Sequence, residues 1–239
     1  MAVAKRSLYQ VLLESGRRRW PAIVVDVKLR SPRDGELLRV ERLEAYLDAL
    51  NEAGVEALST PTDPVHFGGS VEIAGRIRAR CDIPLLRKEF FTSVAQMDES
   101  HDAGFDAVQL SLGTIPDREL LRAMRRRAER LGLEVVIGAH GERQLCEAIG
   151  LGASAIGLNN RDITALELDS GTVTSTEALM PLVPPGVYVI SESGLLSTAD
   201  VARAATAGVH AVMIGTAVAR SDDPTALVQA LRVDATCAR

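Results

Sequence analysis

Two charged side chains at the end of the first apolar run have a spacing that suits acid–base chemistry. Asp26 and Lys28 follow the apolar stretch 22–25 and lie two residues apart. In an extended strand, residues two apart point to the same face, so the carboxylate and the ammonium would lie side by side. Because burying unpaired charge is costly, this pair predicts a polar site at the end of a strand.

Other apolar runs also end in polar groups. In chain order these groups are Ser59 and Thr60, Lys88 and Glu89, Asn159 and Arg161, Glu192 and Ser193, and Gly215 and Thr216. If the runs are parallel strands of a barrel, their carboxyl ends meet around one cavity. Two lysines, several carboxylates and an amide there suit general acid–base catalysis on an anionic substrate. The plainer alternatives are a core amide for Asn159 and an ion pair with Asp162 for Arg161.

Lys88 is the first candidate for the catalytic acid. A lysine at the end of a buried strand loses hydration, which lowers its pKa, although a nearby carboxylate opposes that shift. The plainer alternative is a structural ion pair with Glu89 or Glu192. Lys28 suits the binding of a phosphate or a carboxylate, whereas Asp26 could simply balance its charge.

Two late glycines indicate a phosphate site. Gly194 and Gly215 each stand where a strand is expected to end, and Thr216 follows the second. Backbone N–H groups of such turns, together with a short helix N-terminus, bind phosphate in barrel enzymes. Turns also need glycine for conformational reasons, so each glycine alone is weak evidence. The pair at the last two strands predicts a phosphorylated substrate.

Short apolar runs alternate with amphipathic stretches along the chain, which predicts alternating strands and helices. The expected strands are 23–28, 55–59, 85–88, 107–111, 134–137, 155–159, 187–191 and 211–215. The main expected helices are 40–52, 71–80, 94–103, 117–131 and 198–207.

The predicted fold class is α/β, and the architecture follows from the number of strands. Eight strands in 239 residues match a (β/α)8 TIM barrel. A doubly wound open sheet usually has a glycine-rich turn after its first strand, which this sequence lacks. We therefore predict a single barrel domain over residues 1–239, with a short N-terminal helix at 7–15.

Composition excludes several classes of function. A net charge of −5 argues against a nucleic-acid partner, and no apolar run reaches the roughly 20 residues of a membrane span. The N-terminus lacks the pattern of a secretory signal, so we expect a cytoplasmic protein. Cys81, Cys146 and Cys237 are widely separated, as are the 4 histidines, which predicts free thiols and no metal site. We expect no cofactor, and a monomer or a weak homo-oligomer.

Five segments resemble the motifs of the indole-3-glycerol-phosphate synthase family. They are VDVKLRSPRDG at the first expected strand, HFGGS after the second, PLLRKEF at the third, IGLNNRD at the sixth, and SESG with VMIGTA at the seventh and eighth. They follow the family's order from about residue 24 to about residue 219. The resemblance implies a carboxy-lyase of tryptophan biosynthesis, which closes an indole ring. Its substrate, 1-(2-carboxyphenylamino)-1-deoxyribulose 5-phosphate, loses carbon dioxide and water.

The resemblance also implies roles for the matching residues. Lys88 would protonate the ketone oxygen as the ring carbon attacks, and Lys28 would hold the anionic end groups. Asp26, Asn159 and Glu192 complete the implied catalytic set. The other implied site residues are Ser31, Phe67, Phe90, Arg161 and Ser193 for the substrate, and Lys28, Gly194, Gly215 and Thr216 for its phosphate. This chemistry needs no metal, because a cationic lysine can stabilise charge that develops on oxygen.

The chain departs from the family pattern around the expected pocket. Gly138 ends the fifth strand where the family has a glutamate that is expected to take part in dehydration. Asp26 replaces the usual glutamate, and Gln109 and Ser111 replace apolar residues of the fourth strand. Losing an acid–base group typically costs about 10²–10⁴ in rate. Two alternatives therefore stay open: a specialised-metabolism relative acting on a related phosphorylated aryl-amino sugar, and a non-catalytic relative that binds a phosphorylated ligand.

Overall fold

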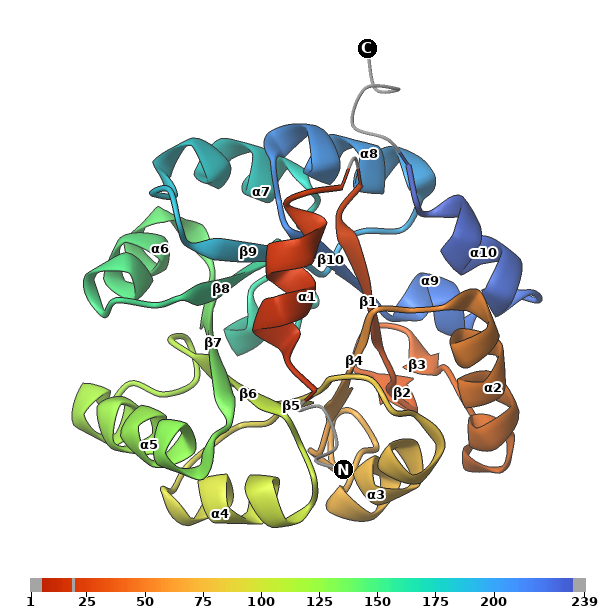
Figure 1. Ribbon diagram of the computed structural model, residues 1–239, viewed down its shortest axis with the longest axis horizontal. Coiled ribbons are helices and arrows are strands. Elements are labelled where there is room, and N and C mark those ends of the chain that lie inside the picture. The colour runs from red at the N-terminus through yellow and green to blue at the C-terminus, as the bar shows by residue number, and fades with distance from the viewer. Residues whose placement is uncertain (1–5, 19, 234–239) are drawn as a thin grey trace.

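Parallel strands close into a barrel with helices around its outside (Figure 1). The computed structural model describes residues 6–18 and 20–233. The barrel strands are β1 (Ala22–Asp26), β4 (Ala57–Pro61), β5 (Leu85–Lys88), β6 (Ala107–Ser111), β7 (Glu134–Ala139), β8 (Ala155–Asn159), β9 (Tyr188–Glu192) and β10 (Ala211–Ile214). Each strand pairs in parallel with the next along the chain, and β10 pairs with β1 to close the ring. The TIM barrel predicted from the alternating pattern is confirmed.

Helices and short turns connect the strands. The helices are α1 (Leu8–Ser15), α2 (Leu43–Ala53), α3 (Val71–Arg80), α4 (Ala95–Asp102), α5 (Arg118–Leu131), α6 (Gly141–Gly150), α7 (Thr174–Leu179), α8 (Thr198–Ala207), α9 (Thr216–Ala219) and α10 (Pro224–Ala230). The 3-10 turns are η1 (Val40–Arg42), η2 (Ile163–Ala165) and η3 (Met180–Leu182). A small hairpin of β2 (Arg30–Ser31) and β3 (Gly35–Glu36) lies between β1 and α2.

Helix α5 shows how the sequence places a helix against the barrel. The side chain of Asp117 caps its N-terminus by accepting the N–H groups of the next turn. Leu121, Met124 and Ala128 are buried, and their spacing puts them on one face. The helix ends at Gly132, whose φ of 80° is the left-handed conformation that suits glycine. The chain then enters β7.

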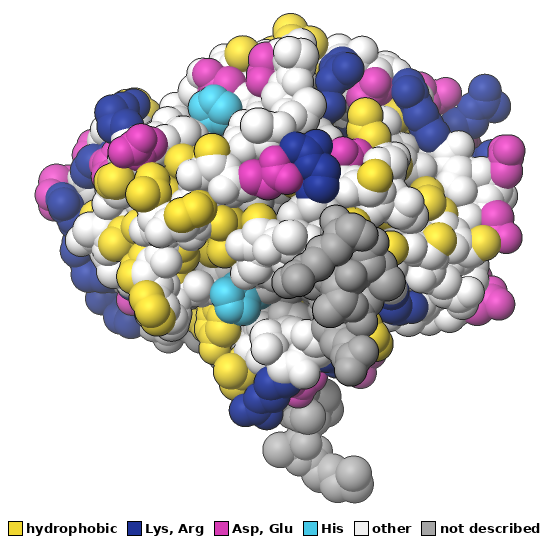
Figure 2. All heavy atoms as spheres, turned by 90° about the horizontal axis from the view of Figure 1, so that it is seen from above, with side chains coloured by type: hydrophobic (Ala, Val, Ile, Leu, Met, Phe, Trp, Pro, Cys, Tyr) yellow, Lys and Arg dark blue, Asp and Glu magenta, His cyan; other side chains and the backbone are white. Residues whose placement is uncertain are grey.

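Exposed ion pairs join neighbouring helices on the outer surface. Arg203 of α8 donates to Glu177 of α7 at 2.8 Å, and Arg76 of α3 donates to Glu44 of α2 at 2.9 Å. Figure 2 shows basic and acidic side chains interspersed with apolar atoms over one face of the molecule. Such pairs contribute little to stability because solvent screens them, so the fold depends chiefly on its core.

Some strand boundaries differ from the predicted ones, and the differences affect the site. The first strand ends at Asp26, so Lys28 stands in the segment that leads to the β2–β3 hairpin. The N–H of Val27 still bonds to the carbonyl of Ser59 at 2.8 Å, which keeps the chain extended beyond the strand. Two strands away from β1 in the barrel, Glu192 is the last residue of β9, one residue beyond the predicted end. Lys28 thus reaches the site from a loop, and Glu192 from within the sheet.

Helix α1 covers the amino-terminal end of the barrel (Figure 1), and its predicted position at 7–15 is confirmed. Its buried Leu8 and Leu12 belong to a core cluster with side chains from the barrel strands. Five strands begin with a fully buried alanine, which leaves room for these leucines: Ala22, Ala57, Ala107, Ala155 and Ala211. The helix therefore closes one end of the barrel and leaves the carboxyl ends of the strands for chemistry.

Within the described residues, no helix is both long and apolar enough to cross a membrane. Across the same parts of the chain, no cluster of three or more His, Cys, Asp or Glu side chains could hold a metal ion. Cys81 and Cys146 are free thiols, as predicted, and Cys237 lies outside the described residues.

We predict that Leu12→Ala destabilises the protein by about 2–5 kcal/mol, because it leaves a cavity where α1 meets the barrel. Urea unfolding followed by circular dichroism measures this change. Leu13→Ala is the matched control, since Leu13 is 38% exposed on the same helix and should change stability by no more than about 0.5 kcal/mol. Equal effects of the two substitutions would contradict the role assigned to α1.

Candidate active site

Two adjoining cavities lie at the carboxyl ends of the barrel strands. The larger cavity encloses about 740 Å³ and the smaller about 370 Å³. Asp26, Lys28, Lys88 and Glu167 line both, so these side chains stand where the two cavities meet. The strand ends therefore converge on one place, as predicted.

The cavities differ in their other lining residues. The larger cavity is also lined by Pro61, Asp63, Phe67, Glu89, Phe90, Gln109, Ser111, Gly113, Thr114, Gly138, Ala139, His140, Gln144, Asn159, Asp162 and Ile163. The smaller cavity is also lined by Arg161, Ser193, Gly194, Leu195, Leu196, Met213, Ile214, Gly215 and Thr216.

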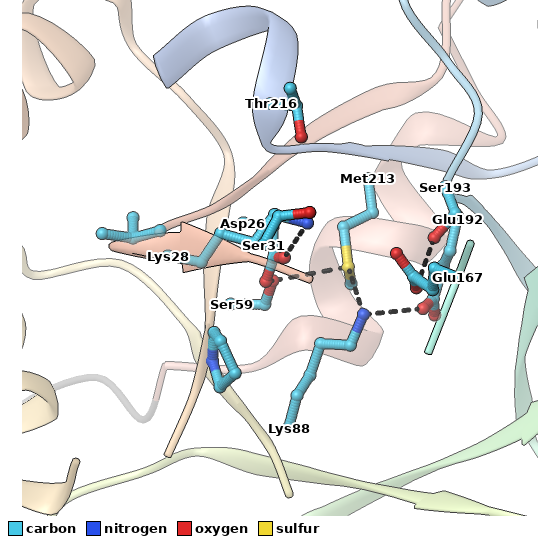
Figure 3. Close-up of polar contacts among 12 residues, drawn as sticks. Asp26, Lys28, Ser31, Ser59, Lys88, Glu167, Glu192, Ser193, Met213 and Thr216 are labelled. Carbon is cyan, nitrogen blue, oxygen red and sulfur yellow. Dashed lines mark hydrogen bonds and ion pairs between the residues drawn. The ribbon is translucent and has the colours of Figure 1, made fainter. Parts of the chain in front are cut away.

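An ion pair crosses the floor of the site between opposite strands of the barrel. Lys88 Nζ, from the end of β5, donates to Glu192 Oε2 of β9 at 3.2 Å (Figure 3). The side chain of Glu192 is fully buried and lines neither cavity. Asp26 Oδ2 lies 3.6 Å from Lys28 Nζ, and its Oδ1 accepts from Ser59 Oγ at 2.6 Å. Each lysine is thus held by a carboxylate.

The pKa of Lys88 is raised from its ordinary value. Burial acts to lower it, but the charges of Glu192, Asp26 and Glu167 and the hydrogen bond from Lys88 to Glu192 outweigh burial. Of the two opposing effects expected from the sequence, that of the nearby carboxylates therefore dominates, and the pKa of Lys88 is raised rather than lowered. Lys88 is a protonated ammonium at neutral pH, which suits an acid and excludes a resting base.

Glu167 is a site residue that the sequence reasoning missed. It follows η2 on the loop between β8 and α7, and Leu166 and Glu167 both have left-handed backbones, with φ of 53° and 58°. This turn points the Glu167 side chain back toward the site (Figure 3). Its Oε1 accepts from Ser193 Oγ at 2.7 Å and from Asn159 Nδ2 at 3.3 Å.

Glu167 is an ionised carboxylate despite its burial. Burial acts to raise its pKa, but the charges of Lys28 and Lys88, followed by its two hydrogen bonds, lower it. The sequence offers no signal for this residue, because it lies in a loop away from every strand end. Only two adjacent left-handed residues that are not glycine bring it to the cavity.

The larger cavity has an aromatic wall beside a positive charge. Phe67 and Phe90, both predicted to bind the substrate, have ring centroids 6.3 Å apart and an interplanar angle of 30°. Lys28 Nζ lies 5.9 Å from the centre of the Phe67 ring. Flat apolar faces next to an ammonium suit an aromatic ring that carries an anionic group.

The smaller cavity contains both glycine turns predicted to bind phosphate. Gly194 has a φ of 68°, and an added Cβ would overlap the carbonyl of Gly171, so only glycine fits there. Gly215 immediately precedes α9, and Arg161, a residue that is 7% exposed, also lines this cavity. Arginine binds phosphate well, so its place in the lining of this cavity suits an anion.

Ser31 is the one predicted binding residue that stands apart from the cavities. It lies on β2, and its Oγ accepts from the N–H of Asp34 at 3.3 Å. It lines neither the larger nor the smaller cavity. Its role in carboxylate binding stays a prediction, as do the roles of the other site residues.

Comparisons with known proteins show the family to which the chain belongs. A model of the family described as "Indole-3-glycerol phosphate synthase" matches residues 1–231. The synthase of Thermococcus kodakarensis is 36% identical over 210 residues, covering 88% of this chain and 91% of that protein. The Pyrococcus abyssi synthase is 34% identical over 207 residues, covering 87% and 89%. The chain belongs to the indole-3-glycerol phosphate synthase family.

A solved structure supports the fold alone. 3-Hexulose-6-phosphate synthase from Salmonella typhimurium superimposes with a TM-score of 0.72 at 15% identity, covering 91% of this chain and all of that one. The likeness is one of barrel architecture, and the synthase family assignment rests on the closer relatives.

One wall of the larger cavity differs from the synthase family pattern. Ser111 of β6 is paired with Gly138 of β7, and the side chain of Gln109 fills the space beside that glycine. A Cβ at position 138 would lie only 3.0 Å from Gln109 Nε2. Gln109 Nε2 donates to Glu192 Oε2 at 3.0 Å, and within the described residues its buried Oε1 has no partner. An amide thus occupies the region where the family resemblance leads us to expect a carboxylate.

We predict that Gly157→Ala lowers kcat/KM about 10²-fold, because the added Cβ would overlap Glu192 Oε1 and displace the carboxylate that holds Lys88. Steady-state assay of indole-3-glycerol phosphate formation measures it. Gly75→Ala is the matched control: no atom lies within 4 Å of its added Cβ, so activity should stay unchanged. Full activity in Gly157→Ala would show that Glu192 need not stay in place.

Proposed function

We propose that this protein is an indole-3-glycerol phosphate synthase. It would close the indole ring of 1-(2-carboxyphenylamino)-1-deoxyribulose 5-phosphate with loss of carbon dioxide and water. The observation that carries the proposal is the ion pair of the fully buried Glu192 with Lys88, which stands at the meeting point of an aromatic-walled cavity and a glycine-lined cavity. The family match supports it independently.

The two cavities suit the two ends of this substrate. The carboxyphenyl ring fits the larger cavity against Phe67 and Phe90, with its carboxylate near Lys28. The phosphate fits the smaller cavity against the turns at Gly194 and Gly215. The carbons that react then lie between them, beside Lys88.

In ring closure, the aromatic carbon that bears the carboxylate attacks the ketone carbon. A carbon–carbon bond forms, and the ketone oxygen takes a proton from the Lys88 ammonium. Loss of carbon dioxide then restores the aromatic ring, because the electrons of the broken bond return to it. Glu192 is a positioning residue, since it holds Lys88 and keeps it charged without lining the cavity. A fixed cation beside the developing alkoxide stabilises the transition state.

Neither alternative from the sequence is favoured. The curated relatives are named as synthases, and the match covers most of the chain. A ligand-binding relative would gain nothing from a buried lysine–carboxylate pair, which is costly to maintain. A cytoplasmic location, a single domain over residues 1–239 and a monomeric or weakly oligomeric state stay predictions.

We predict that Lys88→Met lowers kcat about 10²–10⁴-fold, because it removes the proton donor. The measurement is the rise of indole-3-glycerol phosphate fluorescence from the carboxyphenylamino substrate. Lys28→Met should act mainly by raising KM, since Lys28 is placed to bind anionic groups.

Arg130→Met, which removes an exposed cation on α5, is the control and should leave both constants unchanged. Melting temperatures should show that all three variants fold. Absence of product from the unaltered protein at high enzyme concentration would rule out the synthase activity itself.

A further inference from the structure

Dehydration needs a base as well as an acid, and β7 carries no carboxylate at Gly138. The hydroxyl formed by ring closure leaves as water, and a proton must leave the neighbouring methylene carbon. Gly138 carries no side chain, and Gln109 beside it is an amide, which is not basic at neutral pH. If the proposed function holds, another element must supply the base.

Several carboxylates that line the larger cavity accept hydrogen bonds from nearby backbone N–H groups. Asp63 accepts the N–H groups of His66 and Phe67, at 2.5 and 3.3 Å. Glu89 accepts the N–H of Phe90 at 2.7 Å.

Asp162 and Glu192 are also held by contacts within the protein. Asp162 accepts the N–H of Thr164 at 2.8 Å, at the start of η2. Glu192 is fully buried beneath the cavities. Asp63, Glu89 and Asp162 line only the larger cavity, whereas the reacting carbons are placed where the two cavities meet, and Glu192 lines neither cavity, so none of these groups is placed to be the base.

Asp26 and Glu167 remain, and they differ in what holds them. Asp26 binds Ser59 and the ammonium of Lys28, so both of its oxygens are engaged. Glu167 is held through Oε1, by Ser193 and Asn159, and lines both cavities. A carboxylate anchored through one oxygen can present the other to a substrate.

The loop keeps Glu167 in this position at a conformational cost. Left-handed backbones at residues other than glycine are unfavourable, and two occur in succession at Leu166 and Glu167. Such strain persists only where surrounding contacts fix it, and it is common at functional sites. Here the backbone N–H groups of Leu166 and Glu167 bond to the carbonyls of Ile163 and Asp162, at 2.9 and 3.0 Å, and the Glu167 side chain bonds to Ser193 and Asn159.

We propose that Glu167 is the general base of the dehydration step. Its carboxylate takes the proton from the methylene carbon next to the anilino nitrogen. The electrons of that carbon–hydrogen bond form the new ring double bond as the carbon–oxygen bond breaks. The hydroxyl leaves as water with a proton from Lys88, which solvent water has reprotonated after ring closure. Glu167, now a carboxylic acid, then returns its proton to the lysine amine, which restores both charges.

Electrostatics support this assignment. Lys28 and Lys88 line the same cavities as Glu167, and their charges keep its carboxylate ionised against the effect of burial. An ionised carboxylate beside two ammonium groups gives the site a base and an acid within one small space.

The test separates dehydration from ring closure. Glu167→Gln keeps the shape and should still consume substrate and release carbon dioxide. Formation of the indole should fall about 10²–10⁴-fold, and the decarboxylated carbinol, heavier than the product by one water, should accumulate in quenched samples by mass spectrometry. Glu167→Asp should recover part of the indole formation. Glu142→Gln, at an exposed carboxylate of α6, is the matched control and should behave as the unaltered protein.

Two further measurements exclude a merely structural role. Substrate deuterated at the methylene carbon should show a larger isotope effect on indole formation in Glu167→Asp than in the unaltered enzyme. Ser193→Ala removes the hydrogen bond to Glu167 but leaves the carboxylate, so it should not accumulate carbinol as Glu167→Gln does.

The assignment is overturned if Glu167→Gln slows substrate consumption and indole formation equally, or if no carbinol accumulates while indole formation falls. If the unaltered protein makes the indole and Glu167→Gln is equally active, the assignment is overturned but the synthase activity stands. An unaltered protein that consumes no substrate would instead end the proposed function.

Discussion

The ion pair of half-buried Lys88 with fully buried Glu192 is the interaction on which the site depends. Burying two charges costs several kcal/mol per ion unless geometry and further hydrogen bonds compensate. Glu192 receives a second hydrogen bond from Gln109, and Gly157 leaves the space that its other oxygen occupies. The pair spans the barrel from β5 to β9, so it fixes the acid relative to both cavities. Strands β5 and β9, the small residue Gly157 and the amide of Gln109 are all arranged around the contact between Lys88 and Glu192.

Much of the fold could be predicted because its signals are local and repeat along the chain. Apolar runs that alternate with amphipathic stretches specify strands and helices, and eight such strands leave few architectures. Strand ends were less predictable. An apolar run does not say where the hydrogen-bonded ladder stops, so β1 ends at Asp26 while Val27 still bonds to Ser59. The position of Lys28 on a loop follows from that tertiary contact.

The same reasoning explains which site residues could be found. Lys88 and Asn159 end parallel strands, and parallel strands of a barrel deliver their ends to one place. Glu167 could not be found in this way, because its position depends on two left-handed residues and on partners distant in sequence. Gln109 was recognised as a departure, but only the structure shows that it bonds to Glu192 and fills the space beside Gly138.

Charge balance gives a physical reason for a carboxylate at 167 in place of one at 138. The residues that line both cavities are two cations, Lys28 and Lys88, and two anions, Asp26 and Glu167. The proposed substrate brings a carboxylate and a phosphate to this space. A further glutamate at 138 would add negative charge there and weaken the binding of an anionic substrate. It would also compete with Gln109 for space. Glycine at 138 and glutamate at 167 thus form one consistent arrangement, in which the base that we propose stands on the loop after β8.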